Sequence, residues 1–107
     1  MKPDACEFRR AVCEVVAAIP AGMVATYGQV ACLAGWPSHA RMAGRVLSCV
    51  GAGEGIPCHR VVGASGRTAP CWPGQAAALR AEGVAFRANG HVDMKRCQWD
   101  ASALLPL

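Results

Sequence analysis

A cysteine and a histidine stand side by side near the middle of the chain, in the segment GIPCHRVVG. Cys58 offers a thiol whose thiolate form is a strong nucleophile, and His59 offers an imidazole that can act as a general base. The pair could be a nucleophile with its base, two ligands of a metal ion, or two unrelated residues. Neighbouring side chains on a regular strand point to opposite faces, so direct cooperation needs an irregular turn or a bridging water. Pro57 favours such a turn.

A histidine that acts as a base needs a partner that orients its ring, and Glu82 is the candidate. It stands in the last turn of a predicted Ala-rich helix, just before Gly83. A carboxylate there opposes the helix dipole, at a cost of about 0.3 to 1 kcal/mol. This unfavourable position hints at another use, although an ordinary surface glutamate explains it too.

The seven cysteines favour neither a zinc site nor a disulfide framework, because none forms a Cys-x-x-Cys pair. We therefore expect reduced thiols, most of them buried as small apolar side chains, and neither a metal nor a cofactor. The seven are Cys6, Cys13, Cys32, Cys49, Cys58, Cys71 and Cys97.

Three helices are expected before the Cys-His pair. The first begins after Asp4 as N-cap, with Glu7 completing a capping-box pattern, and ends at Pro20. Its predicted apolar face consists of Phe8, Val12, Val15, Val16 and Ile19.

The second helix begins at the capping box formed by Thr26 and Gln29, and the third is expected to be capped by Ser38. Two helices joined by a tight turn indicate a helix-turn-helix, although an ordinary helical hairpin would read the same. On the third helix we expect Ala40, Ala43, Leu47 and Val50 to face inward.

The outer face of the third helix carries Arg41, Arg45 and Ser48 beside the small residues Ala40 and Gly44. A solvated helix face usually mixes basic with acidic residues, and this helix has no acid. The face could therefore be a surface for a polyanion, or a merely solvated surface.

The rest of the chain predicts an extended segment that turns at Ser65-Gly66 and a β-hairpin at Asn89-Gly90. Trp99 is expected to pack back on the core. The predicted fold is mainly α with a small β-hairpin, a winged helix-turn-helix-like single domain over residues 1–107.

The composition is that of a globular protein, with 53% hydrophobic and 17% charged residues, a net charge of +4 and a pI of about 8.8. No apolar run suffices for a membrane helix, and the N-terminus lacks the pattern of an export signal. We expect a protein that does not enter membranes and is cytoplasmic, or nuclear in a eukaryote.

Four segments in order resemble the O6-alkylguanine-DNA alkyltransferase family, over a region from about Phe8 to Phe86. IPCHRV resembles its active-site motif, and VATYGQVACLAG resembles the first helix of its helix-turn-helix, with the tyrosine at Tyr27. ARMAG resembles the start of the recognition helix, with the arginine finger at Arg41. LRAEG resembles the segment that carries the family's glutamate, which is Glu82 here.

The resemblance implies that the partner is double-stranded DNA containing O6-alkylguanine, bound through the minor groove by a monomer. Small residues let the helix enter the groove, Arg41 inserts where the damaged base leaves the stack, and Tyr27 rotates the adjoining phosphate. The implied DNA-binding residues are Tyr27, Ala40, Arg41, Gly44, Arg45 and Ser48.

The resemblance also implies the chemistry. The carbonyls of Cys58 and Val61 accept hydrogen bonds from the guanine amino group, and His59, oriented by Glu82, takes the thiol proton through a water. The thiolate attacks the alkyl carbon, Tyr27 protonates the departing guanine, and the thioether forms once per molecule. The implied catalytic residues are Tyr27, Cys58, His59 and Glu82, and the implied lesion pocket consists of Pro57, Cys58, Arg60, Val61 and Trp72.

Two departures from the family pattern favour a second interpretation. Cys49 and Val50 occupy the region of the family's hinge asparagine, and RTAPCWPGQ replaces its lid loop. Both departures resemble the short alkyltransferase-like proteins, which bind and flip the lesion without repairing it and hand it to nucleotide excision repair proteins. A plain helix-turn-helix regulator and a redox or metal role of the Cys-His pair are further alternatives.

Overall fold

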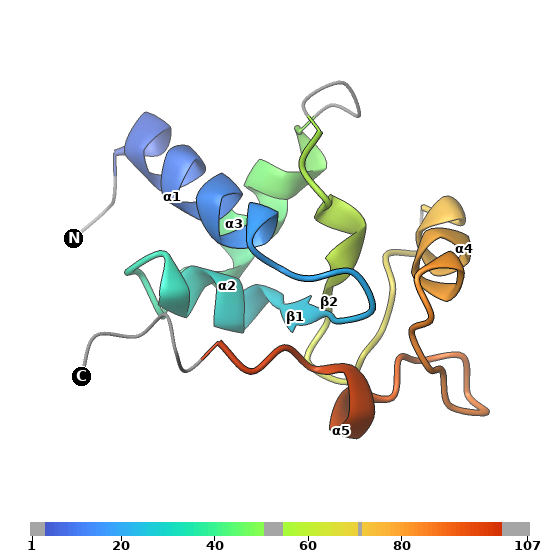
Figure 1. The fold of residues 1–107 in the computed structure, drawn as a ribbon. Helices are drawn as coiled ribbons and strands as arrows, with labels where there is room; N and C mark the ends of the chain where they lie inside the picture. The colour runs from blue at the N-terminus through green and yellow to red at the C-terminus, as the bar shows by residue number, and fades with distance from the viewer. Residues whose placement is uncertain (1–3, 51–54, 71, 102–107) are drawn as a thin grey trace.

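The computed structural model describes residues 4–50, 55–70 and 72–101. Figure 1 shows a mainly helical fold, as the sequence predicts, with a sheet of two short strands between two groups of helices. The elements are α1 (Ala5–Ala17), β1 (Ala25–Thr26), α2 (Tyr27–Leu33), α3 (Ala40–Ser48), η2 (Cys58–Arg60), β2 (Val61–Val62), α4 (Gly74–Ala81) and α5 (Met94–Cys97).

The two helix starts predicted from capping patterns are confirmed. The Asp4 side chain accepts hydrogen bonds from the backbone amides of Cys6 and Glu7 and so caps α1. At α2 the Thr26 hydroxyl accepts from the Gln29 amide at 3.0 Å, and the Gln29 side chain accepts from the Thr26 amide. These bonds satisfy amides that a helix N-terminus leaves without intrahelical partners.

The predicted cap of α3 is wrong. The N-cap of α3 is His39, whose side chain makes no capping bond, while the Ser38 hydroxyl lies 3.2 Å from His39 Nδ1. A capping side chain must directly precede the first helical residue, and Ser38 stands one position too early. Ala43 and Leu47 are buried as expected, so α3 still packs through the predicted face.

The strands pair differently from the predicted hairpin. β1 and β2 are parallel, with Ala25 opposite Val61 and Thr26 opposite Val62. The expected turn at Asn89-Gly90 is present, but its flanks form only the isolated bridge between Phe86 and Val92. The pair of parallel strands therefore joins the start of α2 to the end of the Cys-His turn.

Strand β2 lies between two hydrophobic clusters, because successive side chains of a strand point to opposite faces. Val61 belongs to the cluster of α1, α2 and α3, which Trp99 joins as the sequence predicts, and Val62 belongs to the cluster under α4 and α5. Both valines are completely buried. The turn that precedes β2 is thereby anchored on both sides.

Within the described ranges no helix is long and apolar enough to cross a membrane, and no three His, Cys, Asp or Glu side chains gather as a metal site would require. The six described cysteines form no disulfide with one another, and Cys71 lies outside the described residues. The expectation that most are buried is wrong: Cys6, Cys32 and Cys49 are exposed, and Cys97 is buried.

Candidate functional site

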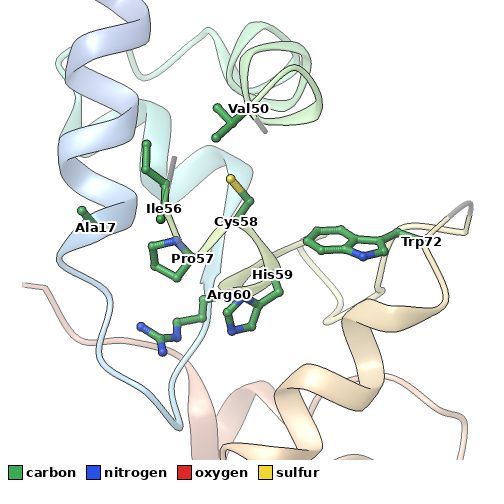
Figure 2. A pocket seen from close by; sticks show the side chains of 9 residues that line it. Ala17, Val50, Ile56, Pro57, Cys58, His59, Arg60 and Trp72 are labelled. Atoms are coloured by element: carbon green, nitrogen blue, oxygen red, sulfur yellow. The ribbon is translucent and has the colours of Figure 1, made fainter. Parts of the chain in front are cut away.

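Cys58 opens the 3-10 turn η2, directly after Pro57. The irregular turn that cooperation with His59 requires is therefore present. Residues of a 3-10 helix follow one another at about 120° around its axis. Figure 2 shows the result: the Cys58 sulfur points toward Val50, and the His59 ring extends from the other side of the turn.

The His59 ring contacts Glu82, as the sequence predicts, but a third residue shares that carboxylate. His59 Nε2 lies 3.0 Å from Glu82 Oε2. Arg60 donates from Nε to Oε1 at 3.0 Å and from Nη2 to Oε2 at 2.6 Å, and its Nη1 donates to the Ile19 carbonyl at 2.8 Å. The side chain of Arg60 thus joins the Cys-His turn to the end of α4 and to the segment after α1.

This cluster fixes the charge of Glu82. Hydrogen bonds from Arg60, with a smaller contribution from His59, lower the pKa of the Glu82 carboxyl to about 2 against the opposing effect of desolvation. The same hydrogen bond raises the pKa of the Arg60 guanidinium. An ionised carboxylate only accepts hydrogen bonds, so His59 Nε2 carries the proton between them. In a neutral imidazole with its proton on Nε2, the other ring nitrogen, Nδ1, is an acceptor.

Two cavities meet at the Cys58 turn. One of about 580 Å³ lies on the α1 side, and one of about 340 Å³ lies on the α3 side. Val50, Cys58 and Trp72 line both. The α1-side cavity is completed by Ala17, Gly55, Ile56, Pro57, His59 and Arg60, and the α3-side cavity by Tyr27, Gly44, Leu47, Ser48 and Ala69.

The α3-side cavity connects the reactive turn with the outer face of α3. Gly44 and Ser48 line it from that helix, and Tyr27 lines it from the start of α2. Arg41 and Arg45 are exposed on the same helix and border a further hollow of about 340 Å³ with Ala40. Of the residues that the sequence suggested for DNA contact, Tyr27, Gly44 and Ser48 thus share a cavity with Cys58, and the others border the neighbouring hollow.

Two residues differ from what the sequence led us to expect. Val61 was expected in the lesion pocket, but its side chain is completely buried and lines neither cavity. Its carbonyl accepts a hydrogen bond from Gln75 Nε2. Gln75, which the sequence analysis missed, is itself completely buried behind the turn. Its signal was its spacing, since Gln75 precedes the buried Leu79 by four residues and shares its helix face.

Fold and site define a small helix-turn-helix domain that holds a thiol in a cavity beside its exposed second helix. The sequence matches the family described as 6-O-methylguanine DNA methyltransferase, DNA binding domain, over residues 7–84. The chain belongs to this family.

Three similar proteins illustrate the range of the family. A DNA base-flipping protein of Escherichia coli K12 is 45% identical over 96 residues, which cover 87% of this chain and 74% of that protein. The crystal structure of S. pombe Atl1 in complex with damaged DNA containing O6-carboxymethylguanine superposes with a TM-score of 0.81 at 28% identity, covering 94% of this chain and 99% of that one. A methylated-DNA–protein-cysteine methyltransferase of Salmonella typhimurium LT2 is 41% identical over 59 residues, 55% of this chain and 34% of that protein.

Proposed function

We propose that the protein binds duplex DNA containing O6-alkylguanine through α3, extrudes the damaged base and holds it beside Cys58. The α3-side cavity carries this proposal, because Gly44 and Ser48 of the exposed helix and Cys58 of the turn line one continuous space. A base that leaves the stack next to α3 has its nearest enclosed space there. One chain supplies both the helix and the cavity, so the protein is proposed to act as a monomer.

The residues around the cavity suit base extrusion from the minor groove. Ala40 and Gly44 have small side chains, so the outer face of α3 can approach the floor of the groove closely. The exposed side chain of Arg41 can then fill the space in the base stack that the departing base leaves. Unstacking costs a few kcal/mol and least for a poorly paired base, which favours a lesion such as O6-methylguanine over guanine. The similarity to a protein named for base flipping and to one solved with damaged DNA supports the same function.

The test compares two duplexes that differ at a single O6-methylguanine. Their affinities are measured by fluorescence anisotropy, and a fluorescent base opposite the lesion reports its extrusion. We expect tighter binding to the lesion duplex together with a fluorescence rise that is absent with the undamaged duplex. Equal affinities with no fluorescence change would reject the proposal and favour a general DNA-binding role.

A second candidate function is transfer of the alkyl group to Cys58, favoured by the position of its sulfur and by the His59-Glu82 pair. In this step His59 Nδ1 accepts the thiol proton through a water. The thiolate forms a bond to the alkyl carbon while the bond from that carbon to guanine O6 breaks. The electron pair passes to guanine, which Tyr27 protonates, and the protein keeps the alkyl group as a thioether.

Intact-protein mass after incubation with the lesion duplex separates transfer from binding alone. Gain of one methyl group, mapped to Cys58 and absent in Cys58→Ala, would establish transfer. An unchanged mass with retained preference for the lesion would establish a sensor, whose bound lesion is then a signal for nucleotide excision repair proteins.

A further inference from the structure

Gln75 is the one polar side chain that is completely buried within the described part of the chain. All of its side-chain hydrogen bonds go to backbone groups. Its Nε2 donates to the carbonyls of His59 at 3.1 Å and Val61 at 2.9 Å, and its Oε1 accepts from the Ala69 amide at 2.7 Å. A buried amide with these partners is fixed in orientation, because the donors and the acceptor cannot be exchanged.

These bonds connect two walls of the α3-side cavity. His59 belongs to the turn that begins at Cys58, and Ala69 begins the short segment that leads to Trp72. Both Ala69 and Trp72 line the cavity opposite α3. The backbone amide of Gln75 also donates to the Trp72 carbonyl at 3.1 Å, so one residue contacts the turn and both ends of the opposing segment.

Among the described residues, the bond from the Ala69 amide to Gln75 is the one hydrogen bond that residues 68–70 and 72 make to a side chain. Trp72 itself is 42% exposed, so packing does not lock its ring. Extruded bases are commonly held between aromatic or apolar side chains, and Trp72 and Tyr27 are the aromatic residues that line this cavity together with Cys58.

We propose that Gln75 is a positioning residue that sets the distance between Cys58 and the wall carrying Ala69 and Trp72, and thereby the selectivity of the cavity for the damaged base. This inference rests on the proposed lesion binding. It assigns no contact between Gln75 and DNA, since Gln75 lies behind the turn. Its effect is therefore on discrimination between lesion and undamaged DNA, while general DNA affinity depends on the exposed cations of α3.

The experiment uses Gln75→Met and Gln75→Glu, with Leu79→Ala as matched control. Gln75→Met removes all three side-chain bonds, and Gln75→Glu keeps an acceptor for the Ala69 amide but loses both donated bonds. Leu79→Ala damages the same helix in a cluster that does not line the cavity. Circular dichroism checks folding, and if Gln75→Met does not fold, Gln75→Glu decides.

Two quantities are measured: the ratio of the two duplex affinities, and the hydrogen-exchange rate of the Ala69 amide. We expect both Gln75 variants to lower the ratio about tenfold, with affinity for undamaged DNA changed less than about twofold. Ala69 exchange should accelerate in Gln75→Met and not in Gln75→Glu. Leu79→Ala should retain the wild-type ratio.

Ratios within twofold of wild type in both Gln75 variants would overturn the inference, as would an equal loss in Leu79→Ala. If the wild-type protein itself does not discriminate, the proposed function fails separately. The positioning role is then decided by the Ala69 amide, whose unchanged exchange in Gln75→Met would overturn it.

Discussion

Arg60 donates hydrogen bonds to both oxygens of the Glu82 carboxylate, at 3.0 Å and 2.6 Å. His59 Nε2 lies within hydrogen-bond distance of the second of these oxygens, Oε2. Glu82 is therefore shared between a residue that stabilises its charge and a residue that could act as a base. Because Arg60 also reaches the Ile19 carbonyl, the orientation of the His59 ring depends on the packing of α1 as well as on α4.

Stability at acid pH should depend on Glu82. Its pKa is about 2 in the folded protein against an ordinary value of 4.5, so the unfolded chain binds the proton more readily. The contribution of this carboxylate is complete above about pH 4.5 and is lost as the pH falls toward 2. Denaturant unfolding across this range should show a shallower loss of stability in Glu82→Gln than in wild type.

The exposed Glu14 of α1 provides the control for that experiment, since it forms no ion pair with another residue of the described ranges. Glu14→Gln should keep the wild-type pH profile. Identical profiles for wild type and Glu82→Gln would mean that the Arg60 ion pair does not stabilise the folded state.

Arg41→Ala should weaken binding to a lesion duplex by about tenfold and binding to single-stranded DNA by much less. The reason is that only the duplex has a stack that a side chain must enter. The matched control is Arg10→Ala, which removes the same charge from the exposed face of α1. Equal losses of affinity for duplex and single-stranded DNA would mean that Arg41 contacts only phosphate and does not enter the base stack.

Gly44→Ala should separate stability from DNA binding. A Cβ at this position would lie 3.7 Å from two ring carbons of Tyr27, an ordinary contact, so the helix should gain about 0.5 to 1 kcal/mol. The added methyl group would also enter the α3-side cavity, and we expect several-fold weaker binding to the lesion duplex. Thermal unfolding and anisotropy measure the two effects, and a more stable variant with unchanged affinity would remove Gly44 from the DNA-facing surface.

Gly66 and Gly90 allow a matched comparison of glycine substitutions, because both have a φ of 87°. They differ in the space available to an added Cβ, which is occupied at Gly66 and open at Gly90. A Cβ at Gly66 would overlap the carbonyl oxygen of Val92, whereas one at Gly90 would meet nothing within 4 Å. Gly90→Ala should cost about 1 to 2 kcal/mol from backbone strain alone, and Gly66→Ala clearly more. Urea unfolding compares them, and equal costs would mean that the turn at Gly66 moves freely away from Val92.

Local patterns predicted the helices well, because each rests on residues close together in sequence. The Asp4 and Thr26 caps and the buried face of α1 needed only neighbours within one or two turns. The parallel pairing of Ala25 with Val61 was beyond such reasoning, since two-residue strands carry no periodicity and their partners lie far apart.

At the site, the sequence predicted that Cys58, His59 and Glu82 lie close together. It did not predict that Arg60 shares the Glu82 carboxylate with His59. Arg60 was expected in the lesion pocket, and it borders the α1-side cavity while its guanidinium binds Glu82. Gln75 was missed because a glutamine in an Ala-rich helix is usually exposed, although its spacing of four residues from Leu79 places it on the buried face.

The register of β1 and β2 has a consequence for how this chain tolerates change. Tyr27 follows β1 and Cys58 precedes β2, so backbone pairing sets the separation between them, and the length of the connecting chain does not. Insertions or deletions between Ser48 and Cys58 can therefore accumulate while the spacing of phenol and thiol stays constant. Divergent lengths in that connection are compatible with an unchanged separation of Tyr27 and Cys58, and a mutation that slips the register by one residue would alter that separation without changing either side chain.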